Sequence, residues 1–362
     1  MMEKRNVYFR VLLERYKHIK NRDEFMKYLY ESMEFSDSSS TVTIRQMGMN
    51  NQDRNIALLR LPIEWIPTAG FYALLNRMMC ALAFADRFRF TPVADKWINS
   101  SYQEEVDING TNHVFEYYFE PLSDISLKEA KKSYNVMIPS NLNMDMVLKQ
   151  YHVVEWYRPS EGFIGKMGQL YRKYICLNNE TKMKIENDIS KILQCSNVLG
   201  IHIRGTDFKQ NHNLHPAALK VDDYEEYIEE AVSKYGFEKI FLATDDIDIR
   251  KEFYKKYGDR VISYENVFRT EGNVSVAYSI GSRKNHKYLL GYEVIRDVYT
   301  LAACNGFIAG NSQVSVGVRI NKASKGENFI YQKIIDKGIN YNTNDWKLEN
   351  IGKRGRNARK KQ

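Results

Sequence analysis

One short polar segment carries residue types suited to gripping a phosphate. It covers residues 202–207, with the sequence His-Ile-Arg-Gly-Thr-Asp, and its first residues end an apolar run typical of a buried strand. The guanidinium of Arg204 stays charged at any working pH, and its fork of N–H donors matches two phosphate oxygens. Gly205 lets the backbone approach a ligand closely, while Thr206 and Asp207 can bond to backbone amides and hold the loop. The alternative is a surface arginine paired with Asp207, which contributes little.

A second polar cluster, Thr244 to Asp246, follows the apolar run 239–243. Aspartate is favoured at helix N-caps, so Asp246 is expected to cap the helix that follows. A role of Asp245 and Asp246 in binding substrate or the neighbouring loop is the second interpretation. Asp246 and Asp248 also form an Asp-x-Asp pair that could bind a divalent metal, although no third ligand is evident.

A third cluster, Asn311 to Gln313, lies where another apolar run ends, with Ser312 and Gln313 at its helical end. These residues begin an expected helix, and the free amides and positive dipole end of a helix suit a diphosphate. A simple helix cap is the alternative. Asp297, on the preceding helix, has a carboxylate that can accept hydrogen bonds from the N–H donors of guanine. A solvated helix face explains it equally simply.

The elements that must position these clusters alternate between strand and helix. Because the carboxyl ends of parallel strands share one edge of a sheet, the three clusters are expected to lie together there. The predicted strands are 198–203, 239–243, 261–263 and 306–309, and the helical stripes fall at 185–193, 224–235, 249–257 and 294–302.

The first half of the chain shows a weaker form of the same pattern. A strand at 55–61, a helix striped over 74–83 and a second strand at 88–93 form the start of a βαβ unit. Pro92 confines that second strand to an edge or an end. Gly70 opens the helix, where it would allow close backbone approach. Residues 1–34 are expected to form a helical lead-in, and residues 100–175 show only an aromatic, irregular pattern.

The length of 362 residues suits two domains. We expect an N-terminal α/β domain at 1–195, a nucleotide-binding α/β domain at 196–341 and a basic, disordered tail at 342–362. The four cysteines form no CxxC pair, which indicates reduced, buried thiols. No signal-like or membrane-spanning apolar run is present, so a cytoplasmic location is expected.

The net charge of +8 does not favour a nucleic-acid partner, because six lysines and arginines lie in the last ten residues. The rest of the chain is therefore close to neutral. A basic tail of this kind could touch an anionic membrane surface weakly, which would make the protein peripheral to the inner membrane.

These segments, in this order, resemble the α1,6-fucosyltransferases that act on N-glycan cores and on nodulation factors. The resemblance covers roughly residues 197–320. In the first half of the chain it is weak and is confined to Gly70 and the helix after it. It rests on five segments: 202–207, His215-Pro216, 242–246, 294–297 and 312–314.

The resemblance implies a GT-B type fold, with two Rossmann-like domains facing each other, and inverting transfer of fucose from GDP-fucose without a metal or cofactor. It implies that Arg204 holds the β-phosphate, with Asp207 beside it as the second catalytic residue. It further implies donor-binding roles for these residues: His202 and Asp297 at guanine, Ser312 and Gln313 at the phosphates, and Asp245, Asp246, Tyr224 and Gly70 elsewhere around the donor.

The sequence departs from the family pattern in three places. Gly205 replaces a second arginine, and Phe208 replaces a lysine. No acidic residue lies between Asp207 and Asp222, so the glutamate that the family carries before His-Pro is missing and the general base is unassigned. The leading hypothesis is a bacterial fucosyltransferase that acts on a glycan or glycolipid. The alternatives are transfer from another nucleotide sugar, or a nucleotide-binding module without catalysis.

Overall fold

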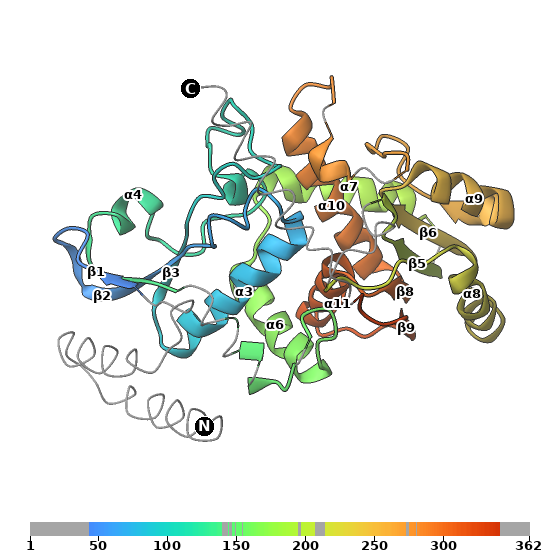
Figure 1. Cartoon of the computed structure of the whole chain (residues 1–362), viewed down its shortest axis with the longest axis horizontal. Coiled ribbons are helices and arrows are strands. Elements are labelled where there is room, and N and C mark those ends of the chain that lie inside the picture. The colour runs from blue at the N-terminus through green and yellow to red at the C-terminus, as the bar shows by residue number, and fades with distance from the viewer. Residues whose placement is uncertain are drawn as a thin grey trace. The chain divides into compact units, whose positions relative to one another are not determined.

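A computed structural model of the chain describes residues 43–340, apart from 140–143, 145–146, 149, 154, 195–196, 207–213, 273–274 and 280. The predicted lead-in at 1–34, the basic tail at 342–362 and Asp207 therefore lie outside the described residues. The chain divides into two compact units between Asn179 and Glu180. Each unit contains a sheet with parallel strand pairs, so the predicted α/β class is confirmed (Figure 1).

The first unit contains a four-stranded sheet in the order β1-β4-β2-β3. Strand β2 (Asn50–Leu59) pairs in parallel with β3 (Thr91–Ala94) and with β4 (Ser133–Ile138), whereas β1 (Thr43–Arg45) is antiparallel to β4. The helix α3 (Phe71–Arg87) connects β2 to β3 and completes the predicted βαβ unit. As Pro92 requires, β3 is an edge strand.

An aromatic cluster around Phe71 holds the start of α3. The rings of Trp97, Tyr102 and Tyr118 meet Phe71 edge-on, with centroids 5.2–5.4 Å apart. Other helices described in this unit are α4 (Leu127–Ala130) and α6 (Glu161–Tyr174), with the 3-10 turn η1 at Val114–Tyr117. The aromatic residues that made 100–175 look irregular are thus largely core residues.

The second unit contains a five-stranded parallel sheet in the order β7-β6-β5-β8-β9. The strands are β5 (Val198–Ile203), β6 (Lys239–Thr244), β7 (Val261–Ile262), β8 (Gly306–Gly310) and β9 (Tyr331–Ile335). All pair in parallel, as the continuous apolar runs predicted.

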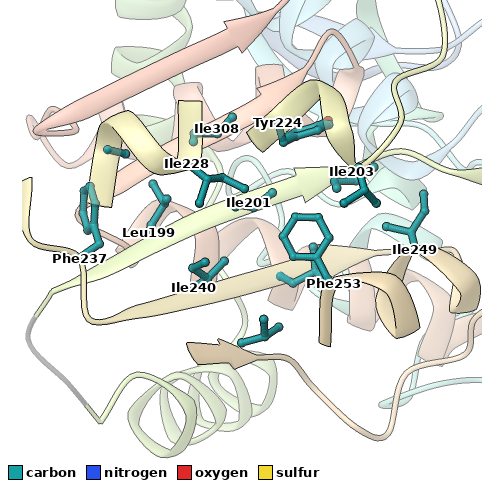
Figure 2. Packing of buried hydrophobic residues seen from close by; sticks show 14 of the residues in the cluster. Leu199, Ile201, Ile203, Tyr224, Ile228, Phe237, Ile240, Ile249, Phe253 and Ile308 are labelled. Atoms are coloured by element: carbon teal, nitrogen blue, oxygen red, sulfur yellow. The ribbon is translucent and has the colours of Figure 1, made fainter. Parts of the chain in front are cut away.

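Helices cover both faces of this second sheet. On one face, Leu199, Ile201 and Ile203 of β5 pack with side chains of α8 (Asp222–Tyr235) and α9 (Ile247–Tyr257) (Figure 2). On the other face, a Cβ added at Gly200 would lie 3.1 Å from Leu301 of α10 (His286–Ala303). Because side chains alternate along a strand, His202 shares the α10 face with Gly200. Helix α11 (Gln313–Ser324) packs against α10.

Helix α7 (Asn179–Ile192) belongs with the second unit, although the sequence analysis places it before the division at residues 195 and 196. Asp188 of α7 accepts hydrogen bonds from Tyr292 and Arg296 of α10, both at 3.0 Å. The expectation that the cysteines are buried is wrong for Cys176, which is exposed, while Cys80 and Cys304 are buried. Among the described residues, no helix is both long and apolar enough to cross a bilayer.

Candidate functional site

The polar clusters of the second unit meet at the carboxyl edge of its sheet. From β5 the chain moves to β6 and β7 on one side, and it later returns to β8 on the other. The ends of β5 and β8 therefore flank a topological switch point, the place where open α/β sheets bind ligands. The segments that follow β5, β6 and β8 bring Arg204, Asp245 and Ser312 to this edge, so the structure places these three predicted residues at the same edge of the sheet.

Arg204 is held by a carboxylate from the neighbouring strand end. Its Nη1 donates to Oδ2 of Asp245, which also accepts from the Thr206 hydroxyl at 2.9 Å. The other oxygen, Oδ1, accepts from the Gly205 amide at 2.9 Å. Asp245 thus binds three successive residues of the β5 loop. The surface pairing expected as the alternative, with Asp207, lies outside the described residues, whereas the Asp245 pair is mostly buried.

Gly205 is required by the closeness of the β6–α9 turn. A Cβ built on it would lie 2.4 Å from Cβ and 2.7 Å from Oδ2 of Asp246. Real Cβ atoms do not approach this closely, and both elements are fixed, the loop by Asp245 and the turn by its own cap. The arginine that the resemblance implies at this position therefore does not fit here without a rearrangement.

We expect Gly205→Ala to destabilise the protein by about 1–3 kcal/mol, because the added methyl overpacks a fixed contact with Asp246. Thermal unfolding monitored by circular dichroism measures this loss. Gly165→Ala is the matched control, since a Cβ there meets nothing within 4 Å. A Gly205→Ala protein as stable as the Gly165→Ala protein would show that the turn can move aside.

Asp246 is a helix cap, as its first interpretation states. It is fully buried, and its Oδ1 accepts from the amides of Asp248 and Ile249 at 2.8 and 3.2 Å at the start of α9. Asp248 points to solvent and contacts Lys251 at 3.4 Å. Among the described residues, no group of three or more histidine, cysteine, aspartate or glutamate side chains could hold a metal ion. Metal independence of the reaction remains a prediction.

His202 is a buried, neutral imidazole at the end of β5. Burial, aided by the charge of Arg204, lowers its pKa to about 3. Its Nδ1 is buried without a hydrogen-bond partner among the described residues. Such an orphaned atom is uncommon in a folded core and fits a ligand contact. The guanine contact implied for His202 thus remains a prediction that this geometry favours.

Tyr224 lies beneath the site and supports the end of β5. It is completely buried, and its hydroxyl donates to the carbonyl of His202 at 3.1 Å. Burial raises its pKa far above the ordinary value, so it stays protonated. These contacts position the strand end, and direct contact between Tyr224 and a donor remains a prediction.

Asp297 presents a carboxylate from α10 that accepts no hydrogen bond from the described residues. Although part of the residue stays accessible, burial raises its pKa to about 7, while Arg296 and Arg269 oppose the shift. Glu293 and Asp245 act in the same direction as burial. The alternative of a solvated helix face is therefore disfavoured, because a carboxyl in water keeps its ordinary pKa.

Ser312 and Gln313 begin α11 as predicted, with Ser312 as its N-cap. The Ser312 hydroxyl accepts from the Ser315 amide at 3.0 Å, and the Ser315 hydroxyl accepts from the Ser312 amide at 3.0 Å. The simple cap is thus present. The positive dipole end of α11 is then the feature that suits phosphate oxygens. Phosphate binding by Ser312 and Gln313 remains a prediction.

Two further residues lie at the site, and the sequence did not predict a ligand contact for either of them. Asn311, between β8 and α11, is buried and its Nδ2 has no partner among the described residues. Arg269, in the loop after β7, donates to the carbonyls of Thr244 and Tyr264. Asn311 belongs to the predicted third cluster, where it was given no role of its own. No local pattern marks Arg269, because its partners come from distant elements.

Gly70, in the first unit, precedes α3 and is exposed. A Cβ there would meet only the Tyr102 hydroxyl, at 4.0 Å, and its φ of −67° suits any residue. Nothing within the first unit therefore demands glycine at this position. The role proposed for it at the donor remains a prediction.

Residues 89–316, more than half of the chain, match a family described as alpha-(1,6)-fucosyltransferase N- and catalytic domains. The match contains all the site residues described above except Gly70. A comparison with proteins of curated function finds no match.

Two similar solved structures are those of fucosyltransferase NodZ from Bradyrhizobium and of POFUT1 in complex with GDP-fucose. NodZ is 16% identical over 74% of this chain and 91% of its own, with a TM-score of 0.46. POFUT1 is 14% identical over 80% of this chain and 99% of its own, with a TM-score of 0.46.

Proposed function

The chain belongs to the α-(1,6)-fucosyltransferase family, and we propose that it transfers fucose from GDP-fucose to a hydroxyl of a glycan or glycolipid. The observation that carries this proposal is the placement of Arg204. Its guanidinium is held by Asp245 at the switch point of the second sheet, on the same sheet edge as the start of α11. A fixed cation and the positive end of a helix at one sheet edge suit a diphosphate.

In the proposed reaction the acceptor hydroxyl attacks the anomeric carbon of fucose. The bond from that carbon to the diphosphate oxygen breaks, GDP leaves with the electron pair, and a base takes the hydroxyl proton. Attack from the side opposite the leaving group inverts the anomeric configuration. Arg204 stabilises the negative charge that develops on the departing diphosphate, and this is its catalytic role. The base remains unassigned.

The donor side of this proposal rests on His202, on the sheet face that α10 covers, and on Asp297 of α10 itself. We place guanine there, with its N–H groups donating to the Asp297 carboxylate. The diphosphate then reaches toward Arg204 and the start of α11. We assign the acceptor to the first unit, which in a GT-B arrangement faces the second and brings Gly70 to the donor. A cytoplasmic location is part of the same proposal.

Turnover of nucleotide sugars by the purified protein tests the proposal against its alternatives. GDP-fucose, GDP-mannose and UDP-galactose are incubated with a panel of oligosaccharides, and products are identified by mass spectrometry. We expect fucosylated product from GDP-fucose. Preference for another donor would support the other-sugar alternative, and binding of GDP-fucose without turnover on any acceptor would support the non-catalytic module.

The reaction is expected to proceed in excess EDTA at full rate. Arg204 and the amides of α11 can neutralise the leaving diphosphate, which is the task a divalent ion performs in metal-dependent transferases. Asp246→Asn should change stability or donor affinity without creating a need for metal, because Asp246 is engaged as a cap. Activity that vanishes with chelator and returns with magnesium or manganese would contradict this account.

Donor affinity is expected to depend on pH through Asp297. Its raised pKa of about 7 means that the carboxylate is increasingly protonated below pH 7, and guanine needs the ionised form. Calorimetric GDP affinity should therefore fall by up to about tenfold per pH unit below pH 7 and level off above it. Asp297→Asn should remove this dependence. Equal affinity at pH 6 and pH 8 in the unmodified protein would contradict it.

The stability of the ligand-free protein should change with pH in the opposite direction from the GDP affinity. Between the ordinary aspartate pKa of 3.8 and about 7, the folded protein retains a proton that the unfolded chain has released. The contribution of Asp297 to the free energy of unfolding therefore falls as pH rises through this window. A rise in pH through this window therefore strengthens GDP binding and lowers the contribution of Asp297 to folding stability.

A further inference from the structure

Arg269 is an arginine that backbone carbonyls hold in place near the edge of the second sheet. Its Nε donates to the carbonyl of Thr244, the last residue of β6, at 3.2 Å, and its Nη2 donates to the carbonyl of Tyr264 at 2.9 Å. These two bonds fix the plane of the guanidinium. They leave Nη1, which makes no hydrogen bond with the described residues.

The segment that carries Arg269 spans from α10 to the turn after β6. The amide of Phe268 donates to Glu293 of α10 at 3.4 Å, and the amide of Thr270 donates to the carbonyl of Asp245 at 3.1 Å. Glu293 and Asp297 are four residues apart on α10, so they lie on one face of that helix. Arg269 therefore lies between the Asp297 face of α10 and the turn that holds Arg204.

Arg269 and Asp297 interact electrostatically, and competing partners of both are already engaged. The acids that also act on Arg269 are Glu265 and Glu293. Glu265 accepts from Arg250, and Glu293 from Arg283. The other cation beside Asp297 is Arg296, whose guanidinium lies 3.7 Å from the centre of the Tyr264 ring and donates to Asp188. The Asp297 carboxylate and Nη1 of Arg269 thus have no hydrogen-bond partners among the described residues. Nε and Nη2 of Arg296 also lack partners there, but that guanidinium is buried against the face of the Tyr264 ring, whereas Arg269 is held by its edge.

This pair matches the hydrogen-bonding edge of guanine. That edge carries the acceptor O6 beside the donors N1–H and N2–H₂, and an arginine is a common partner of guanine O6. Adenine carries an amino donor in place of O6, so two hydrogen-bond donors, its amino group and the guanidinium, would face each other. Uracil offers acceptors on both sides of its single N–H, so one of them would face the carboxylate.

We propose that Arg269 donates from Nη1 to guanine O6 while Asp297 accepts from N1–H and N2–H₂, so that the two residues together select guanine. This assignment rests on the proposed GDP-sugar donor. Arg269 is then a specificity-determining residue that the sequence patterns do not reveal. Its two carbonyl contacts preorganise the guanidinium before the base arrives.

Nucleotide analogues that change one atom of the base separate the two contacts. Isothermal titration calorimetry compares GDP with 6-thio-GDP, in which a poor acceptor replaces O6, and with IDP, which lacks the N2 amino group. For Arg269→Met we expect GDP affinity to fall about 10- to 100-fold and the preference for GDP over 6-thio-GDP to disappear. The preference for GDP over IDP should persist in that variant and disappear in Asp297→Asn.

Two further variants keep the test independent of folding. Lys256→Met removes a cation of α9 that contacts Asp222 and Glu225, so it should leave both preferences unchanged. Arg269→Lys keeps the charge beside Asp297 but lacks the fork, so it should remain folded in thermal melts and still lose discrimination at O6.

The outcome that overturns the assignment is an equal loss of GDP and 6-thio-GDP affinity in both Arg269 variants, with the preference between them intact. Arg269 would then act only as a structural cation. Failure of the proposed function looks different, because it is seen in the unmodified protein. If that protein bound UDP or ADP better than GDP, the donor proposal would fall and the assignment with it.

Discussion

Arg204→Ala should reduce kcat/KM for GDP-fucose roughly 30- to 1,000-fold, the equivalent of about 2–4 kcal/mol of transition-state stabilisation. The substitution removes the charge-assisted bonds to the diphosphate, and these strengthen as negative charge develops. Arg204→Lys should restore only part of the rate, because an ammonium lacks the fork that grips two oxygens. Steady-state kinetics with a responsive acceptor measure both variants.

The fold should survive the loss of Arg204. Asp245 keeps its bonds from the Gly205 amide and the Thr206 hydroxyl, so the loop remains attached to the end of β6. Arg250→Ala serves as the matched control, because it removes a guanidinium from α9 that bonds Ser263 and Glu265. Near-full activity of a folded Arg204→Ala protein would refute the phosphate clamp.

Asp297→Asn should raise the KM for GDP-fucose and the Kd for GDP about 30- to 1,000-fold, with a smaller effect on kcat. The carboxylate is proposed to accept two guanine N–H groups, and hydrogen bonds to a charged group contribute about 1.5–3 kcal/mol each. The asparagine amide presents N–H donors to those same groups. Because guanine is remote from the reacting bond, the loss is expected in binding.

The stability of this variant separates binding from folding. Burial disfavours the Asp297 carboxylate, so the neutral asparagine should leave the protein at least as stable at neutral pH. Asp248→Asn is the matched control, because that carboxyl is exposed and bonds only to Lys251 among the described residues. Unchanged GDP affinity in Asp297→Asn would remove Asp297 from the donor site.

The sheet of the second unit could be predicted because its central strands are continuous apolar runs. Strand β5 has the predicted bounds, and β6 and β8 each extend one residue further. Burial on both faces explains why apolar residues dominate these strands. β9 was missed because it is a partly exposed edge strand that carries Gln332 and Lys333. The short β4 was missed among the aromatic residues of the first unit.

The site could be predicted where it follows directly from the strands. Arg204, Asp245 and Ser312 come immediately after strand ends, and parallel pairing brings such ends to one edge. The position of Arg269 could not be predicted, because its partners are backbone carbonyls of β6 and of its own loop, and its neighbour Asp297 comes from α10. The clash that makes Gly205 necessary depends on the β6–α9 turn, which the local sequence does not specify either.

A crystal structure of the protein with GDP-fucose tests the central claim most directly. We expect the diphosphate at the guanidinium of Arg204 and the first-turn amides of α11, and guanine beside His202 and Asp297. A nucleotide bound elsewhere on the chain, or one at the sheet edge without a contact to Arg204, would contradict the account.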